Sequence, residues 1–133
     1  MTRTTVVAAA GLYFAAVCGC GGGPQGTADP SAREKLEEVK AMLDTVAADR
    51  AKPPSKPSEL AAVEPYLPTS ANDIRSGELV YQWGATLSPG GSAVLAYEKK
   101  APTDGGYVLL QDGTVKHMTA QEFAAAPKAA AKK

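Results

Sequence analysis

The chain has 133 residues, in which 14 lysines and arginines balance 14 aspartates and glutamates. Because a nucleic-acid-binding protein needs a basic excess to neutralise phosphates, this balance argues against nucleic acid as a partner. Two cysteines and one histidine offer few ligands for a transition metal, and we expect no cofactor.

The N-terminal segment has the features of a secretory signal peptide. Arg3 supplies a positive charge, and residues 4–17 are apolar or small, which fits an apolar region of about 7–15 residues. This run is shorter than the roughly 20 apolar residues that cross a bilayer. It leads into Val17-Cys18-Gly19-Cys20, and a small residue is expected just before the cleavage point.

The segment Val17-Cys18-Gly19-Cys20 resembles the lipobox of bacterial lipoproteins, with residues 1–19 as the signal peptide. Cleavage before Cys20 places Gly19 beside the scissile bond, whereas cleavage before Cys18, the alternative, places the branched Val17 there. The resemblance implies a diacylglyceryl group on Cys20, an acylated amine, and a lipid anchor in the cell membrane or outer membrane outside the cytoplasm. Secretion after ordinary cleavage, a buried N-terminal helix and an uncleaved anchor are the other interpretations.

A glycine-rich segment and then a helix are expected next. Residues 20–30 contain no large apolar residue, which is typical of a flexible tether. Ser31 and Glu34 have the spacing of a capping box and predict a helix over about residues 31–50. Pairs of opposite charge four residues apart support it: Arg33 with Glu37, and Lys40 with Asp44. Apolar residues recur at helical spacing: Leu36, Val39, Met42, Leu43 and Val46.

Prolines in residues 52–57 end this helix, and residues 58–63 predict a short helical piece with Leu60 and Val63 turned inward. Alternation then predicts four strands, at about residues 78–83, 93–97, 107–111 and 114–118. On the first strand, Leu79, Tyr81 and Trp83 share a face, and Gly90-Gly91 marks a turn before the second.

The last two strands are predicted to form a tight hairpin. Asp112-Gly113 is typical of a type I′ turn, in which both central residues take positive φ. After the hairpin, Thr119 is expected to cap a terminal helical turn over residues 119–123. Residues 126–133 are mildly basic and predict a disordered tail, with contact to anionic lipid headgroups or cell-wall polymers as the alternative.

These elements predict one α+β domain over residues 31–125, in which one long N-terminal helix packs on an antiparallel meander of about four strands. Their order is similar to that of the globular part of type II secretion pseudopilins. Residues 93–123 resemble more closely a related bacterial family, in which a glycine-rich turn leads to a strand and then Asp-Gly-x-Val. That family carries a histidine, nine residues and then Asp-Gly, and here Pro102 stands in the histidine position.

The chain also departs from pseudopilins at its N-terminus. Pseudopilins polymerise through a continuous hydrophobic N-terminal helix with a prepilin cleavage site, whereas here a glycine-rich segment precedes the predicted domain. The resemblance therefore implies a fold and a compartment, and it does not imply filament assembly.

Several polar residues are candidates for a site. Asp104, Asp112 and Glu98 could meet at the hairpin ends and hold calcium through their oxygens, although turn formation accounts for Asp104 and Asp112 without an ion. His117, expected on the same strand face as Val115, could act with Asp112 or Glu98 as the acid or base of a small hydrolase or transferase on an envelope polymer. A surface or half-buried histidine is the simpler interpretation.

Aromatic residues could form a binding face for a sugar or peptide, or could pack in the core: Trp83, Tyr81, Tyr97 and Tyr107. The sequence has no Gly-x-Ser-x-Gly elbow and no phosphate-binding loop. We therefore expect a membrane-anchored lipoprotein whose small non-enzymatic domain binds or scaffolds an envelope or secretion protein. The small hydrolase or transferase is the alternative.

Overall fold

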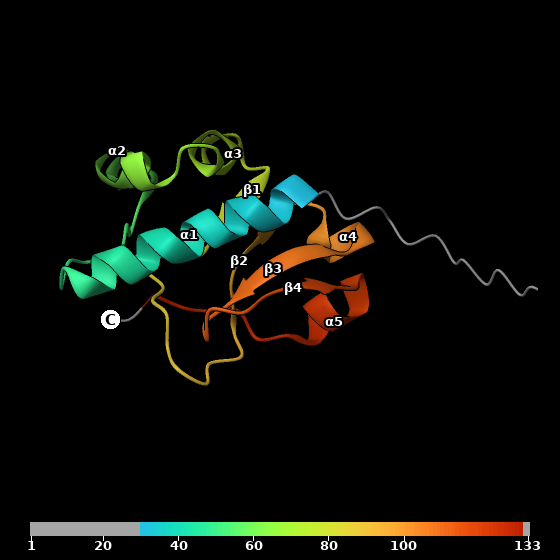
Figure 1. Ribbon diagram of the computed structural model, residues 1–133. Coiled ribbons are helices and arrows are strands. Elements are labelled where there is room, and N and C mark those ends of the chain that lie inside the picture. Colours follow the sequence, from blue (N-terminus) through green and yellow to red (C-terminus); the bar gives the residue numbers. More distant parts are fainter. Residues whose placement is uncertain (1–29, 132–133) are drawn as a thin grey trace, which may run out of the picture.

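The computed structural model describes residues 30–131, and over this range the fold is α+β with a four-stranded antiparallel sheet (Figure 1). The helical segments before the sheet are α1 (Pro30–Ala48), the 3₁₀ turn η1 (Pro57–Glu59), α2 (Leu60–Val63), the 3₁₀ turn η2 (Glu64–Tyr66) and α3 (Ser70–Ser76). The strands are β1 (Leu79–Tyr81), β2 (Val94–Glu98), β3 (Gly106–Leu110) and β4 (Val115–Met118). Two more helices, α4 (Ala101–Asp104) and α5 (Ala120–Ala125), follow β2 and β4.

The sheet is the meander that the sequence predicts, since its order is β1-β2-β3-β4 and every neighbouring pair is antiparallel. The register places Ala96 opposite Tyr81 on one side and Leu109 on the other, and Leu109 opposite Val115. These four residues form a row across one face of the sheet, because side chains directly opposite in paired strands share a face.

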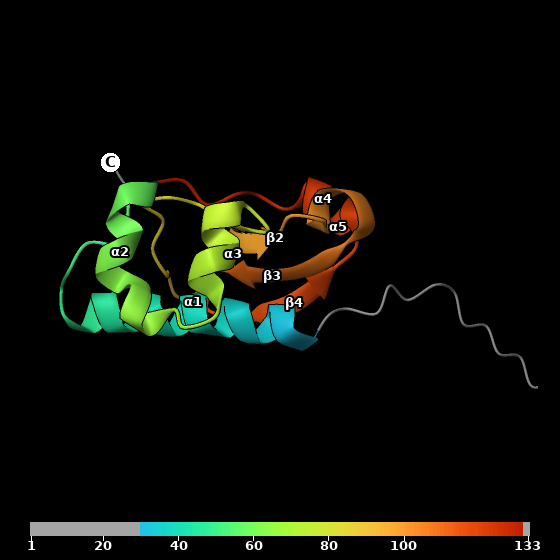
Figure 2. The same cartoon turned by 90° about the horizontal axis from the view of Figure 1, so that it is seen from above.

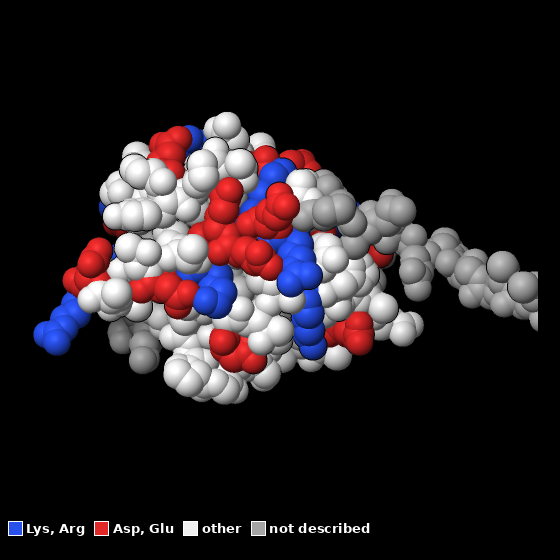
Figure 3. Space-filling view, viewed as in Figure 1, with Lys and Arg blue, Asp and Glu red and all other residues white. Residues whose placement is uncertain are grey.

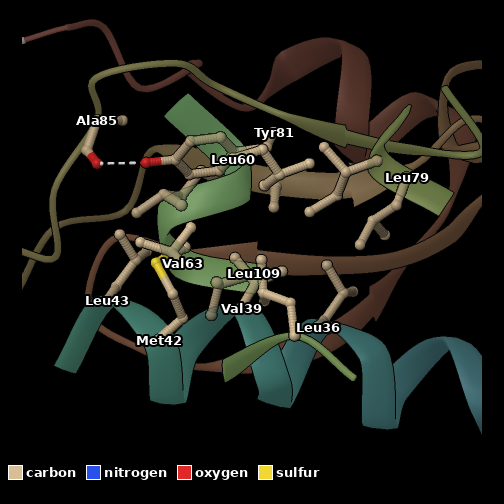
Figure 4. Close-up of a cluster of buried hydrophobic side chains, with 14 of the residues drawn as sticks. Leu36, Val39, Met42, Leu43, Leu60, Val63, Leu79, Tyr81, Ala85 and Leu109 are labelled. Carbon is tan, nitrogen blue, oxygen red and sulfur yellow. Dashed lines mark hydrogen bonds between the residues drawn. The ribbon is translucent and has the colours of Figure 1, made fainter. Parts of the chain in front are cut away.

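α1 crosses this face of the sheet and contributes five of the buried residues of the main core (Figure 4). Its predicted apolar stripe is buried, as are Leu60 and Val63 of α2, at most 9% exposed. Both predicted charge pairs form on its outer side, with Nε of Arg33 2.9 Å from Glu37 and Nζ of Lys40 2.5 Å from Asp44.

The opposite face of the sheet is covered as well. A second cluster of buried side chains lies there: Val94, Ala101, Val108, Leu110, Met118 and Phe123. Ala101 belongs to α4 and Phe123 to α5, and the two helices lie side by side at the end of the sheet near the start of α1 (Figure 2). The sequence pattern did not predict α4, because a four-residue helix shows no apolar periodicity.

Both ends of α1 differ from the prediction. The helix already includes Pro30, so it begins one residue before the predicted start at Ser31; proline is favoured at the first helical position. At the other end, Arg50 has φ of +53° and Ala51 N–H donates to the Val46 carbonyl at 2.9 Å. This is a Schellman-type ending, and it stops α1 at Ala48, before residue 50.

The β3–β4 hairpin forms at the predicted place with a different turn. Gly113 has φ of +87°, and Asp112 is not among the residues with positive φ, so the type I′ assignment is wrong. Gly113 N–H donates to the Leu110 carbonyl at 3.0 Å, and Leu110 N–H donates to the Thr114 carbonyl at 2.9 Å. These bonds are those of a three-residue loop with glycine in the left-handed position.

The C-terminal segment is ordered over the residues that the structure describes, so the disordered tail predicted from residue 126 is wrong as far as Ala131. Val94 N–H donates to the Pro127 carbonyl, and Ala129 N–H donates to the Val94 carbonyl, both at 2.8 Å. Ala129 is 6% exposed and belongs to the main core. The segment therefore pairs with β2 just beyond the residues that β1 occupies.

Candidate functional site

A polar cavity lies where the start of α1 meets α3, the start of β1 and the end of β2. We call it the charged pocket, and its volume is about 380 Å³. Three lysines and three carboxylates surround two small or apolar residues in its lining: Ala32, Lys35, Asp73, Glu78, Leu79, Glu98, Lys99 and Lys100.

Each lysine of the charged pocket forms an ion pair within it. Lys35 of α1 contacts Asp73 of α3, and Lys99 lies 3.0 Å from Glu78 across the β1–β2 pair. Lys100 lies 3.2 Å from Glu98. Because the Lys99–Glu78 side chains are more than 60% exposed, that pair contributes little to folding, and its groups can reorient at small energetic cost.

Glu98 is the most buried charged residue of the charged pocket, since only 11% of its side chain is exposed. The Tyr107 backbone N–H donates to its Oε2 at 2.6 Å. Gly106 makes this possible, because a Cβ at that position would lie 2.7 Å from Oε2. The sequence marked Glu98 as a candidate site residue. Its position against the backbone could have been inferred from Gly106, the glycine that leaves room for its carboxylate.

The calcium hypothesis required Asp104, Asp112 and Glu98 to meet, and the strand register contradicts it. Asp112 lies in the turn after the C-terminal end of β3, and its N–H donates to the Gly91 carbonyl at 3.0 Å. Glu98 instead bonds to Tyr107 at the start of β3. Within residues 30–131 no three acidic, histidine or cysteine side chains are arranged to hold a metal ion.

Asp112 instead has the turn role that the sequence favoured. Its Oδ1 accepts the Thr114 N–H at 2.8 Å. This backbone hydrogen bond and a weaker one from the Thr114 side chain lower the pKa of Asp112, because they stabilise the charged carboxylate.

His117 lies on β4, on the face that also carries Val115, as predicted by alternation. Its register partner is Tyr107, whose ring meets the imidazole edge to face at a centroid distance of 5.6 Å. Glu98 lies on the other side of Tyr107, so His117 and Glu98 are two strands apart, roughly 10 Å. The two candidate acid–base groups therefore share a face without contacting each other.

The aromatic residues do not form a single surface. Tyr81 is buried in the main core, where its hydroxyl donates to the Ala85 carbonyl at 3.0 Å and burial raises its pKa, and Trp83 packs edge to face on it. Tyr97 lies on the opposite face of the sheet against Phe123. The aromatic binding face is therefore wrong, and core packing explains these side chains.

Cys18 and Cys20 lie outside the described residues. Among helices of residues 30–131, none combines the length and apolar character needed to span a bilayer. Over the side of the domain that carries α1, acidic side chains form a group near the middle of the view, and basic side chains border it (Figure 3).

Comparison with known proteins found no matching family model, no matching curated protein and no matching solved structure.

Proposed function

We propose that this protein is a membrane-anchored extracytoplasmic lipoprotein whose small α+β domain binds or scaffolds another envelope component and does not catalyse a reaction. The observation that carries the proposal is the lipobox-like Val17-Cys18-Gly19-Cys20 after a short apolar run. Cys20 stands ten residues before Pro30, the first residue of α1. A glycine-rich segment of this length suits a tether between a lipid and a folded domain.

The arrangement of the polar residues favours binding over catalysis. General acid–base chemistry requires a titratable group within hydrogen-bond reach of the reacting atoms, and its usual partner close by. Tyr107 separates His117 from Glu98, and Glu98 is already held by a backbone N–H and Lys100. The charged pocket has instead the groups of both signs that recognise a polar ligand.

The pseudopilin resemblance is carried here as a proposal about the fold alone. A helix that precedes an antiparallel meander supports it, as does the hairpin that contains Asp112 and Gly113. Because α4 and α5 also cover the second face of the sheet, we infer from this resemblance only the class of partner, which is a secretion or envelope protein.

The lipid anchor is testable with two single substitutions in the producing cell. Cys20→Ala removes the thiol that accepts the diacylglyceryl group, so we expect the protein to leave the membrane fraction and to lose incorporation of labelled palmitate. Cys18→Ala is the matched control and should retain both. Continued palmitate labelling of Cys20→Ala would assign the anchor to Cys18. Absence of the protein without substitutions from the membrane fraction would overturn the proposal.

A further inference from the structure

The charged pocket lies at the end of the domain where the chain enters from its N-terminus. Ala32 and Lys35 in its wall stand 12 and 15 residues after Cys20. This inference rests on the proposed function, in which Cys20 is fixed to a membrane. A tether of ten residues has an r.m.s. span of roughly 16–19 Å, which brings the charged pocket within reach of lipid headgroups.

We propose that the charged pocket binds the headgroup of a phospholipid that carries both a phosphate and a primary ammonium, that is, a phosphoethanolamine group. Three lysines and three carboxylates line the cavity and pair with one another, so a ligand with a single sign of charge that opened one of these pairs would leave its other member unmatched. A zwitterion matches both sets. The cavity of about 380 Å³ has room for roughly a dozen water molecules, which is more space than one such group fills.

Glu98 provides the ammonium site. A carboxylate offers about four acceptor positions, and the Tyr107 N–H and Lys100 Nζ occupy two of them. Because the side chain is only 11% exposed, a further hydrogen bond to a charged donor forms in a medium of low dielectric and gains strength. A choline group has no N–H and cannot make this bond, so the pocket should bind an ethanolamine headgroup more tightly than a choline headgroup.

The lysines provide the phosphate site. Lys99 is 62% exposed in its pair with Glu78, so its ammonium can turn to a phosphate at little cost. Lys35 of α1 lines the same cavity. A divalent metal does not fit as the occupant, because the carboxylates within residues 30–131 do not converge into a metal-binding group.

The first experiment titrates the purified full-length protein with soluble headgroups and follows backbone amide shifts of Lys99 and Tyr107 by NMR. We expect saturable shifts with glycerophosphoethanolamine, and at least tenfold weaker binding of glycerophosphocholine and glycerophosphoglycerol. Absence of saturable shifts, or equal affinity for the three headgroups, would overturn the proposal. This titration does not depend on the lipid anchor. If no headgroup binds while Cys20→Ala releases the protein from the membrane, the headgroup site is wrong and the lipid anchor still stands.

Variants locate the binding within the pocket. Glu98→Gln should weaken glycerophosphoethanolamine binding at least tenfold and reduce the preference over glycerophosphocholine. Lys99→Gln, at an exposed position that folding does not require, should weaken binding while the protein keeps its melting temperature. Glu64→Gln is the matched control, because Glu64 pairs with Arg75 outside the charged pocket. An unchanged affinity in both pocket variants would contradict the assignment.

A vesicle experiment identifies the source of the headgroup. The lipidated protein is reconstituted in phosphatidylethanolamine–phosphatidylglycerol or in phosphatidylcholine–phosphatidylglycerol vesicles, and acylation of Lys99 by an amine-reactive reagent is followed by mass spectrometry. We expect slower acylation of Lys99 relative to Lys56 only with phosphatidylethanolamine; the rate at Lys56 corrects for reagent that the lipid amines consume. Equal acylation of Lys99 in the two membranes would exclude the membrane as the source, even if the soluble headgroup binds.

Discussion

Two residues in the left-handed region show how single positions fix the ends of elements. Gly113, with φ of +87°, turns β3 into β4, and Arg50, with φ of +53°, ends α1. Glycine adopts this conformation freely, whereas a residue with a Cβ pays about 1–2 kcal/mol. The hairpin therefore has the suitable residue at its turn, and the end of α1 does not.

Gly113→Val should destabilise the domain by about 1–2 kcal/mol, because a β-branched side chain tolerates positive φ poorly. A Cβ at this position would also lie 2.9 Å from Cε of Lys40. Urea denaturation followed by circular dichroism measures the loss. Gly113→Asn, which tolerates the left-handed region better, should lose less, and equal stability of the valine variant and the parent would contradict the turn described here.

Arg50→Gly should stabilise the domain by about 0.5–1 kcal/mol, since glycine removes the strain at the C-terminus of α1. The same denaturation experiment tests it. Asp49→Gly, one residue earlier at a position without positive φ, should instead lower the free energy of unfolding, so the two neighbouring glycines are expected to act in opposite directions.

At the scale of elements, α3 depends on a side chain from another helix. Glu38 of α1 accepts the backbone N–H groups of Thr69 at 3.1 Å and Ser70 at 2.9 Å, and both of their hydroxyls. Thr69 makes no side-chain cap of its own. α5 is the opposite case, because Thr119 and Glu122 form a complete capping box within the segment, as the sequence predicted for Thr119.

Glu38→Gln should cost about 1–2 kcal/mol at pH 7, because the charged carboxylate caps the N-terminus of α3. Burial alone would raise the pKa of Glu38, and the hydrogen bonds from Thr69 and Ser70 outweigh it and lower the pKa below 4.5. The stabilisation is therefore complete above about pH 4.5 and is lost as the pH falls through the lower folded-state value.

Melting curves of parent and Glu38→Gln between pH 7 and pH 3 test this sign. The difference in melting temperature should be largest near neutral pH and should shrink towards pH 3. Glu37→Gln is the control on the same helix, since its exposed pair with Arg33 contributes well under about 1 kcal/mol. A difference in melting temperature between the parent and Glu38→Gln that stays constant with pH would contradict the capping role.

At the scale of the whole molecule, the C-terminal segment continues the pairing along β2 beyond the end of β1. β1 pairs only with Ala96 to Glu98 of β2, and Pro127 and Ala129 bond to Val94 beyond it. Lys128 fixes the path of this segment, because its Nζ donates to the carbonyls of Phe123 at 2.6 Å and Ala126 at 2.7 Å. The described C-terminal end lies at the opposite end of the domain from the start of α1 (Figure 1).

Ala129→Asp should therefore destabilise the whole domain by about 2 kcal/mol or more, because it places a carboxylate without a partner in the main core. Ala130→Asp is the matched control at the adjacent exposed position and should change the free energy of unfolding by less than about 0.5 kcal/mol. Denaturant titration of both variants measures the difference. Equal stability of the two variants would mean that the segment does not contribute to the fold.

The sequence by itself determined the elements whose signals are local. The stripe from Leu36 to Val46, the alternation of the strands, and the Thr119 cap each lie within a few residues, so the helix α1, the meander and the start of α5 were predictable. The lipobox-like motif at Cys20 is local as well and carries the proposed anchor, although it lies outside the described residues.

Only the tertiary structure decided what depends on partners distant in the chain. Glu38 caps a helix 31 residues later, Lys128 lies beside Val94, and the charged pocket gathers residues from Ala32 to Lys100. No short window of sequence contains such partners, because their proximity arises from the packing of α1, α3 and the sheet. The site that we propose for a headgroup exists only once that packing has formed.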